Sequence, residues 1–224
     1  MAKRSMGVII EKMEQALNRE KPPRLTALRG LQIEEQGDPF KILIGTILSA
    51  RTRDENTTRV LNRLFARFST PQDLASADID EIRKTIHSIG FYNVKAARIK
   101  EVSQMLISKF GGLVPSDIDS LLELPGVGRK TANCVLVYGF RRPAIPVDTH
   151  VHRIFNRLGV VKTKTPDETE QELTRIVDRK DWLPLNEVFV KYGQLICKPI
   201  GPKCSLCPLN DRCEWYRENY KNKN

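Results

Sequence analysis

The chain has 224 residues, of which 40% are hydrophobic and 29% charged, and its formal net charge at pH 7 is +10. A chain of this length can bury a substantial core in one large domain or two small ones, and its basic excess favours a polyanionic partner, either nucleic acid or an anionic membrane surface. The longest apolar stretch, residues 42–50, is too short to span a bilayer, which excludes a transmembrane protein. The apolar run over residues 8–10 ends at Glu11, so we expect no signal peptide and a cytoplasmic protein (nucleoid-associated if prokaryotic).

Helical spacing of apolar residues dominates the chain, and no segment alternates convincingly as a strand would, so we predict an all-α fold. Asp38 before Pro39 is typical of a helix N-cap followed by proline in the first turn, and Gly90 is placed where a C-terminal cap would end a helix. We expect helices over or near residues 8–17, 39–50, 54–68, 79–89, 93–110, 116–123 and 128–140, and further helices that begin near residues 149, 167 and 185.

A proline-punctuated connection, "RRPAIPVD" at residues 141–148, is the one domain boundary that the sequence suggests. The first apolar stripe, residues 8–17, precedes a polar link with two prolines, "NREKPPR". It could pack with either half of the chain, which leaves a discontinuous domain open.

A glycine-rich turn, "LPGVG" at residues 124–128, separates two of the predicted helices. Gly126 and Gly128 allow the backbone to approach a partner closely, and the N–H groups that begin the following helix form a site for an anion such as a DNA phosphate. Such short glycine motifs also match by chance, so a plain helix–helix turn is the alternative.

Two basic residues, Arg129 and Lys130, follow this turn directly. A lysine in the first turn of a helix opposes the helix dipole instead of complementing it. The same field, with Arg129 nearby and partial burial, is expected to lower the pKa of Lys130 and favour a nucleophilic neutral amine that forms a Schiff base. A lysine that only binds phosphate is the alternative.

Asp148 stands at the start of another predicted helix, in "PVDTHVHRIFNRLG". Its ordinary role there is an N-cap. A capping carboxylate that also faces a cleft could stabilise a developing cation or accept a proton.

Four cysteines gather near the end of the chain with the spacing C-x6-C-x2-C-x5-C: Cys197, Cys204, Cys207 and Cys213. In a reducing compartment such a cluster indicates a metal site rather than two disulfides. Zinc sites more often pair two short C-x2-C knuckles, so the single wrap favours an iron–sulfur cluster over zinc. The loop inside the cluster is basic at both ends and includes Lys203, which suits contact with phosphate.

Taken together, these features resemble the endonuclease III family of helix-hairpin-helix DNA glycosylases. The resemblance covers nearly the whole chain and runs through "LSARTRD", "IGFYNVKAARI", "LPGVGRKTAN", "VDTHVHRIFNRLG" and the cysteine spacing, all in family order. The most specific part is the hairpin with a lysine at 130, an aspartate eighteen residues later and the four cysteines.

The resemblance implies two helical domains, with DNA in the cleft between them. Residues 30–142 would form a six-helix domain that carries the hairpin, and residues 1–29 with 143–224 a domain that holds a 4Fe-4S cluster on the four cysteines. It implies a monomer that acts on duplex DNA containing damaged pyrimidines or abasic sites. Lys130 would attack C1′ of the extruded nucleotide, Asp148 would assist expulsion of the base, and β-elimination would then nick the strand.

The resemblance also implies further DNA contacts. Phe91 occupies the place of an intercalating wedge, although without the resemblance it would be a core aromatic. Arg51 stands where bacterial members commonly have a glutamine. Of the family's properties, the preference for the base opposite the lesion is therefore the one that this resemblance supports least. The hairpin contacts are Leu124, Gly126, Val127, Gly128 and Arg129.

Relatives with other chemistry remain as alternatives. Adenine-removing relatives carry a small residue in place of Lys130, and thymine-mismatch relatives carry a tyrosine, so Lys130 argues against both. A mismatch glycosylase that retains the lysine stays open, as does a non-catalytic iron–sulfur protein that only binds DNA.

Overall fold

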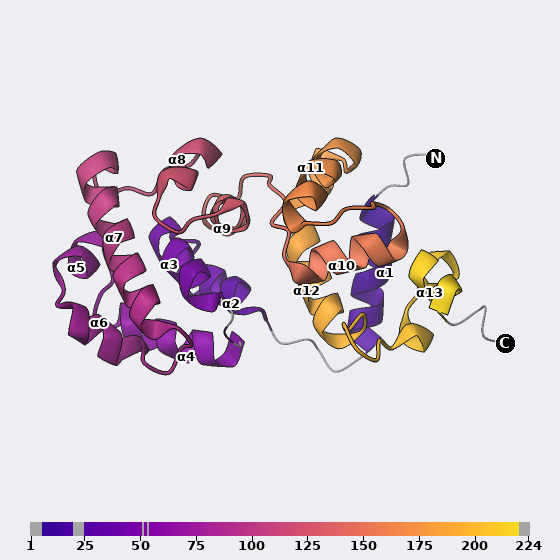
Figure 1. Ribbon diagram of the computed structural model, residues 1–224, viewed down its shortest axis with the longest axis horizontal. Coiled ribbons are helices and arrows are strands. Elements are labelled where there is room, and N and C mark those ends of the chain that lie inside the picture. The colour runs from indigo at the N-terminus through magenta and orange to yellow at the C-terminus, as the bar shows by residue number, and fades with distance from the viewer. Residues whose placement is uncertain (1–5, 20–24, 51, 53, 220–224) are drawn as a thin grey trace. The chain divides into compact units, whose positions relative to one another are not determined.

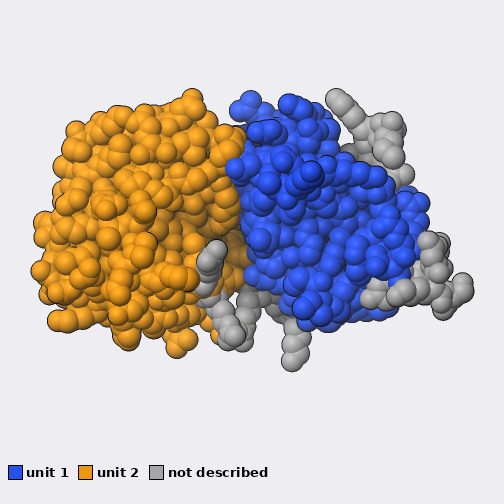
Figure 2. Space-filling view, in the orientation of Figure 1, with its two compact units in different colours: residues 1–24, 143–224 blue, residues 25–142 orange. Residues whose placement is uncertain are grey.

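The computed structural model describes residues 6–19, 25–50, 52 and 54–219. Every regular element within these ranges is a helix, which confirms the all-α fold (Figure 1). The chain divides into two compact units (Figure 2): unit 1 comprises residues 1–24 and 143–224, and unit 2 comprises residues 25–142. Among the described helices, none is long and apolar enough to cross a membrane.

Unit 2 is built around α3 (Pro39–Ser49), whose apolar side chains are buried. This helix begins as predicted, because the side chain of Asp38 accepts hydrogen bonds from the backbone N–H groups of Phe40 (2.8 Å) and Lys41 (3.1 Å). Five elements pack directly on α3: α2 (Ala27–Glu34), α4 (Asp54–Phe65), α7 (Tyr92–Phe110), α9 (Arg129–Cys134) and the π-helical turn η1 (Val135–Gly139). The others pack outside them: α5 (Pro71–Ser76) and α6 (Ile79–Ile86) lie on α7, and α8 (Ile118–Glu123) lies on α9.

Two helix ends in unit 2 differ from the prediction. α6 ends at Ile86, four residues before Gly90, and Gly90 has no left-handed conformation. The residue with that conformation is Phe91 (φ 60°, ψ 30°), which is the N-cap of α7, so this helix begins at Tyr92 and not at Asn93. The predicted helix over residues 128–140 is α9 followed by the looser turn η1.

Unit 1 joins the first helix of the chain to its last third. Helix α1 (Met6–Arg19) packs against α12 (Trp182–Leu195), and the Asp181 carboxylate accepts a hydrogen bond of 3.1 Å from the backbone N–H of Gly7 at the start of α1. The remaining helices are α10 (Thr149–Leu158), α11 (Pro166–Ile176), α13 (Glu214–Asn219) and the 3-10 turns η2 (Arg179–Asp181), η3 (Cys204–Leu206) and η4 (Asn210–Arg212).

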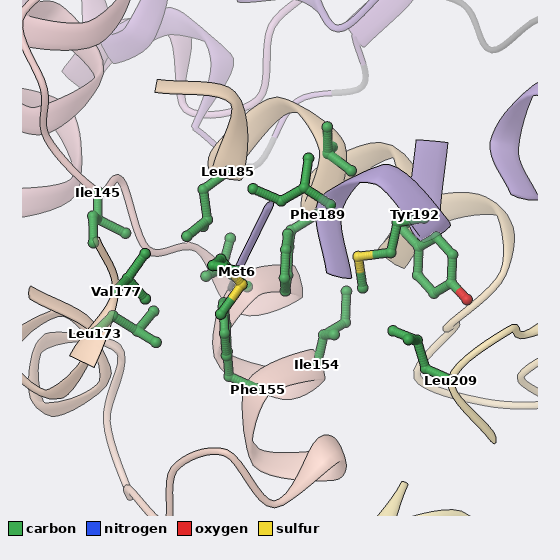
Figure 3. Close-up of a cluster of buried hydrophobic side chains, with 14 of the residues drawn as sticks. Met6, Ile145, Ile154, Phe155, Leu173, Val177, Leu185, Phe189, Tyr192 and Leu209 are labelled. Atoms are coloured by element: carbon green, nitrogen blue, oxygen red, sulfur yellow. The ribbon is translucent and has the colours of Figure 1, made fainter. Parts of the chain in front are cut away.

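A stacked aromatic pair lies at the centre of the unit 1 core. The rings of Phe155 on α10 and Phe189 on α12 are parallel within 6°, with centroids 4.5 Å apart. Figure 3 shows them among the surrounding apolar side chains, with Tyr192 one turn further along α12 and its hydroxyl group pointing away from the pair. This core fixes the helix that begins at Asp148 against the helix that leads into the cysteine segment.

Candidate functional site

The glycine-rich turn connects α8 to α9 and is anchored by two buried side chains. Leu124 and Val127 are 1% and 5% exposed, and the backbone N–H of Val127 donates to the carbonyl of Leu124 at 3.0 Å. Their side chains face the core of unit 2, so the turn offers its backbone and not these side chains to a partner. Gly126 has φ +68°, a left-handed conformation that favours glycine, and a Cβ there would lie 2.6 Å from Nε of Arg98 and displace that side chain.

The start of α9 follows directly. Gly128 is its N-cap, is exposed, and supplies no capping side chain. Arg129 and Lys130 occupy the first turn, and both are partly exposed. The first N–H groups of a helix have no partner within that helix, so this end of α9 presents hydrogen-bond donors and two basic side chains together.

Asp148 caps α10, as its position predicts. Its Oδ1 atom accepts hydrogen bonds of 2.9 Å from the backbone N–H groups of both His150 and Val151. Among the residues that the structure describes, none donates to the second oxygen, Oδ2, and the residue is partly exposed. One carboxylate oxygen therefore holds the helix while the other remains available for chemistry.

Phe91 is exposed and is not a core aromatic. Its side chain is 64% exposed although its backbone is left-handed, a conformation that is rare for a bulky residue and costs about 1–3 kcal/mol. Tyr92 and Val94, close by in the chain, are also exposed, at 36% and 61%. Strain of this kind is retained where the surrounding structure holds it, and it is typical of functional positions.

Arg51 lies outside the described residues, but its neighbours in the chain are held by a lysine that the sequence analysis missed. The ammonium group of Lys95 donates to the carbonyl of Leu48 at 2.9 Å, the carbonyl of Ala50 at 2.7 Å and the hydroxyl of Thr52 at 3.1 Å. Lys95 is only 8% exposed, and this burial lowers its pKa from 10.5 to about 8. Nothing in the sequence around Lys95, "FYNVKAARI", predicts that this lysine is buried.

The four clustered cysteines of unit 1 line one cavity, together with apolar residues and Arg157. The cavity is partly open to solvent and has a volume of about 30 Å³. In the described part of the chain, no three or more His, Cys, Asp or Glu side chains are grouped as a single metal ion would require. Four cysteine thiolates are a donor set that both zinc and an iron–sulfur cluster accept.

The thiols in this cavity destabilise each other's charged form. Burial, and then the charges of the neighbouring cysteines, raise the pKa of Cys204. Burial is also the main cause of the raised pKa of Cys207 and of Cys213. Four thiolates are therefore stable here only when a bound cationic group compensates them, as it does in metal and iron–sulfur sites.

Tyr192 and Arg157 are two further residues of this cavity that the sequence analysis missed. The Tyr192 hydroxyl is buried beside the sulfur of Cys207, and burial, followed by the charge of Cys207 and a hydrogen bond to it, raises the pKa of Tyr192 well above the usual range. The Arg157 guanidinium lies 4.4 Å from the centroid of the Trp215 ring, and its Nη1 lies 3.5 Å from the Cys197 sulfur. Buried donors beside sulfur fit a cluster whose sulfurs accept hydrogen bonds.

The loop inside the cysteine segment is held at its base by the same arginine. Arg157 donates to the carbonyls of Lys198 (2.7 Å) and Pro199 (2.9 Å), and the Lys203 N–H donates to the carbonyl of Ile196 (2.9 Å). Lys203 is partly exposed at the end of this loop. Both ends of the loop are thus held by hydrogen bonds, and a lysine stands at each end.

Comparisons with known proteins agree with this geometry. Residues 44–179 match the HhH-GPD superfamily of base excision DNA repair proteins. The endonuclease III of Thermotoga maritima is 51% identical over 187 residues, which cover 84% of this chain and 88% of that protein. The solved structure of a trapped endonuclease III–DNA covalent intermediate, an estranged-adenine complex, is 34% identical with a TM-score of 0.83, over 97% of this chain and 98% of the other.

A thermostable thymine-DNA glycosylase of known structure has the same TM-score of 0.83 at 25% identity, over 95% of this chain and 96% of the other. The fold alone therefore does not separate the two activities. The higher sequence identity lies with the endonuclease III proteins.

Proposed function

Because the chain belongs to the endonuclease III family of HhH-GPD base excision repair proteins, we propose that Lys130 and Asp148 are its catalytic residues and that damaged pyrimidines and abasic sites in duplex DNA are its substrates. The chain is a bifunctional DNA glycosylase and abasic-site lyase. The observation that carries the assignment of Lys130 is its place in the first turn of α9, directly after a turn that exposes backbone donors.

Lys130 provides the nucleophile of the reaction. Its neutral amine attacks C1′ of the damaged nucleotide, a C1′–N bond to lysine forms, and the electron pair of the glycosidic bond leaves with the base, which takes up a proton. The sugar ring then opens to give a protonated Schiff base. Loss of a C2′ proton expels the 3′ phosphate by β-elimination, and water releases the lysine.

Asp148 supports this sequence with the oxygen that does not cap α10. A carboxylate stabilises the positive charge that develops at the sugar as the base leaves, and it can take the proton that the reaction releases. Because Oδ1 is fixed by two backbone donors, the orientation of the carboxylate is set before the substrate binds.

DNA is bound through its phosphates and opened at the damaged nucleotide. The exposed backbone of Gly126 and Gly128, with Arg129, holds a phosphate. The damaged base must leave the stack before C1′ can be reached. Phe91 fills the space it leaves, and Arg51 contacts the base that remains.

We further propose that Cys197, Cys204, Cys207 and Cys213 hold a 4Fe-4S cluster. A bound cluster would supply a tie between the loop at residues 198–203 and the core of unit 1, and Lys203 would then be presented to phosphate. Tyr192 would donate its hydroxyl proton toward the cysteine sulfurs, since it lies buried beside Cys207.

Borohydride trapping tests the catalytic proposal. Wild-type protein is mixed with a duplex that carries one thymine glycol, and a covalent adduct is expected with wild type and is lost in Lys130→Ala. An undiminished adduct in Lys130→Ala would exclude Lys130 as the nucleophile. An adduct formed on a G·T mismatch and not on thymine glycol would favour a mismatch glycosylase.

The cluster has its own test. Iron and acid-labile sulfide are measured on protein purified without oxygen, and about four of each per chain are expected for this cluster type. One zinc and no sulfide would contradict the proposal.

A further inference from the structure

A buried lysine next to the exposed Phe91 is unexplained by the catalytic scheme. Lys95 donates three hydrogen bonds, and all three acceptors are uncharged groups at the end of α3 or just after it. Two of them, the carbonyls of Leu48 and Ala50, belong to the end of α3, where helical carbonyls lack partners and where a positive charge is favoured by the helix dipole. Lys95 therefore acts as a C-cap that α7 supplies to α3.

The same residue closes the first turn of α7. Its backbone N–H donates to the carbonyl of Phe91 at 3.0 Å. On the other side of Phe91, the side-chain amide of Asn56 on α4 donates to the carbonyl of Ser88 at 2.7 Å. Lys95 thus fastens the start of α7 to the end of α3, and Asn56 fastens the turn before Phe91 to the start of α4.

The hydrogen bonds of Lys95 do more than fill space. An apolar side chain of the same length would avoid the cost of burying an ammonium, but it would leave the carbonyls at the end of α3 without this donor. Hydrogen bonds are directional, so the three acceptors of the ammonium fix where α7 begins relative to the end of α3. A displacement of about 1 Å at a group that acts on substrate can cost about a hundredfold in rate.

We propose that Lys95 is a positioning residue for base extrusion, which holds the start of α7 on the end of α3 so that Phe91 is presented at the place where it enters the duplex. This inference rests on the proposed role of Phe91 as the wedge. Lys95 does not touch DNA in this scheme. It acts on the reaction through Phe91 and matters only for substrates that must be extruded from a stack.

The test compares one abasic site in two contexts. In a duplex the site must be extruded, whereas in a single strand it needs no extrusion. Lys95→Met is expected to lower the rate of strand nicking on the duplex about tenfold to a hundredfold and to leave the single-strand rate within about twofold. An equal loss on both substrates, after correction for the folded fraction, would overturn the proposal.

Lys100 provides the matched control. It lies on the same helix, is partly buried, and its ammonium also donates to a backbone carbonyl, that of Ala77. Lys100→Met removes a comparable contact far along α7 from Phe91 and is expected to leave the ratio of duplex to single-strand rates unchanged. If Lys100→Met shifts that ratio as much as Lys95→Met, the effect is general loosening of α7 and the proposal is wrong.

A double-mutant cycle connects Lys95 to Phe91. If the lysine acts only through the wedge, Phe91→Ala combined with Lys95→Met loses no more duplex activity than Phe91→Ala alone. Losses that simply add would contradict the proposal. Should Lys95→Met fail to fold, Thr52→Val removes one of the three acceptors with little change of shape, and it too must lower the duplex rate selectively.

The design separates this inference from the proposed function. If wild-type protein gives no borohydride adduct even with the single-strand abasic site, the lyase proposal fails. If wild type forms the adduct and Lys95→Met keeps the wild-type ratio of rates, only the inference about Lys95 fails.

Discussion

The guanidinium of Arg157 is stacked over the ring of Trp215, 4.4 Å from its centroid, and from there donates to the carbonyls at the base of the loop at residues 198–203. Arg157→Lys keeps the charge but loses the planar stacking and the paired donors. We expect faster amide hydrogen exchange in this loop, equivalent to a local loss of about 1–3 kcal/mol. Arg175→Lys on the exposed surface of α11 is the control, and unchanged exchange in Arg157→Lys would contradict the anchoring role.

Substitutions of Asp148 can separate its helix-capping role from its proposed catalytic role. Asparagine caps helices as well as aspartate does, so Asp148→Asn is expected to keep the thermal stability of the protein while base release slows about a hundredfold to ten-thousandfold. Asp148→Ala should lose the same activity and in addition about 1 kcal/mol of stability. The measurements are single-turnover base release and thermal unfolding.

The same substitution at another cap is the control for Asp148. Asp38 caps α3 through two backbone N–H groups in the same way, so Asp38→Asn is expected to change neither stability nor base release appreciably. If Asp148→Asn releases the base at the wild-type rate, the carboxylate has only its capping role.

Whether a feature of the fold could be predicted from the sequence depends on whether the residues that cause it lie close together in the chain. The N-cap at Asp38 was predicted because the capping residue and the proline after it lie side by side in the chain. The left-handed Phe91 was not predicted, since local rules favour glycine for that conformation and the contacts near Phe91 come from distant parts of the chain, such as that of Asn56 on α4 with the carbonyl of Ser88. Gly90, the residue that local rules favour for that conformation, does not adopt it.

The candidate site divides in the same way. Lys130, Asp148 and the four cysteines stand in motifs whose residue types and spacing suggest their chemistry. Lys95 and Tyr192 have no such motif, because burial and not pattern makes a lysine or a tyrosine unusual. Only the structure shows that Lys95 is buried against the end of α3 and that Tyr192 is buried in the cysteine cavity.

The stacked pair Phe155 and Phe189 carries a stability prediction. Both rings are fully buried in the core of unit 1, with centroids 4.5 Å apart. Phe155→Ala is expected to lower the free energy of unfolding by about 3–5 kcal/mol, because it leaves a cavity that the helices cannot close. Phe155→Leu, which keeps much of the volume, should lose markedly less, and equal losses in denaturant unfolding would show that the site collapses freely.

The lowered pKa of Lys95 predicts how the stability of the protein changes with pH. Burial lowers its pKa from 10.5 to about 8, so between these values the unfolded chain binds a proton that the folded protein does not. Stability from this group therefore rises with pH across that window and is constant below and above it. The unfolding free energy of wild type minus that of Lys95→Met is expected to increase by up to about 3 kcal/mol from pH 8 to pH 10.5. A difference that stays flat would contradict the shift.

Lys203 carries a salt prediction, because each phosphate that a protein neutralises releases condensed counterions. Lys203→Gln is expected to weaken binding to duplex DNA of any sequence and to reduce the slope of log affinity against log salt concentration by about one. Lys162 is the control, since it is 84% exposed on the same unit and already lies 3.8 Å from the Glu214 carboxylate. Lys162→Gln should leave the slope unchanged. An unchanged slope in Lys203→Gln would remove Lys203 from the phosphate contacts, whereas a sequence-dependent loss would indicate contact with a base instead.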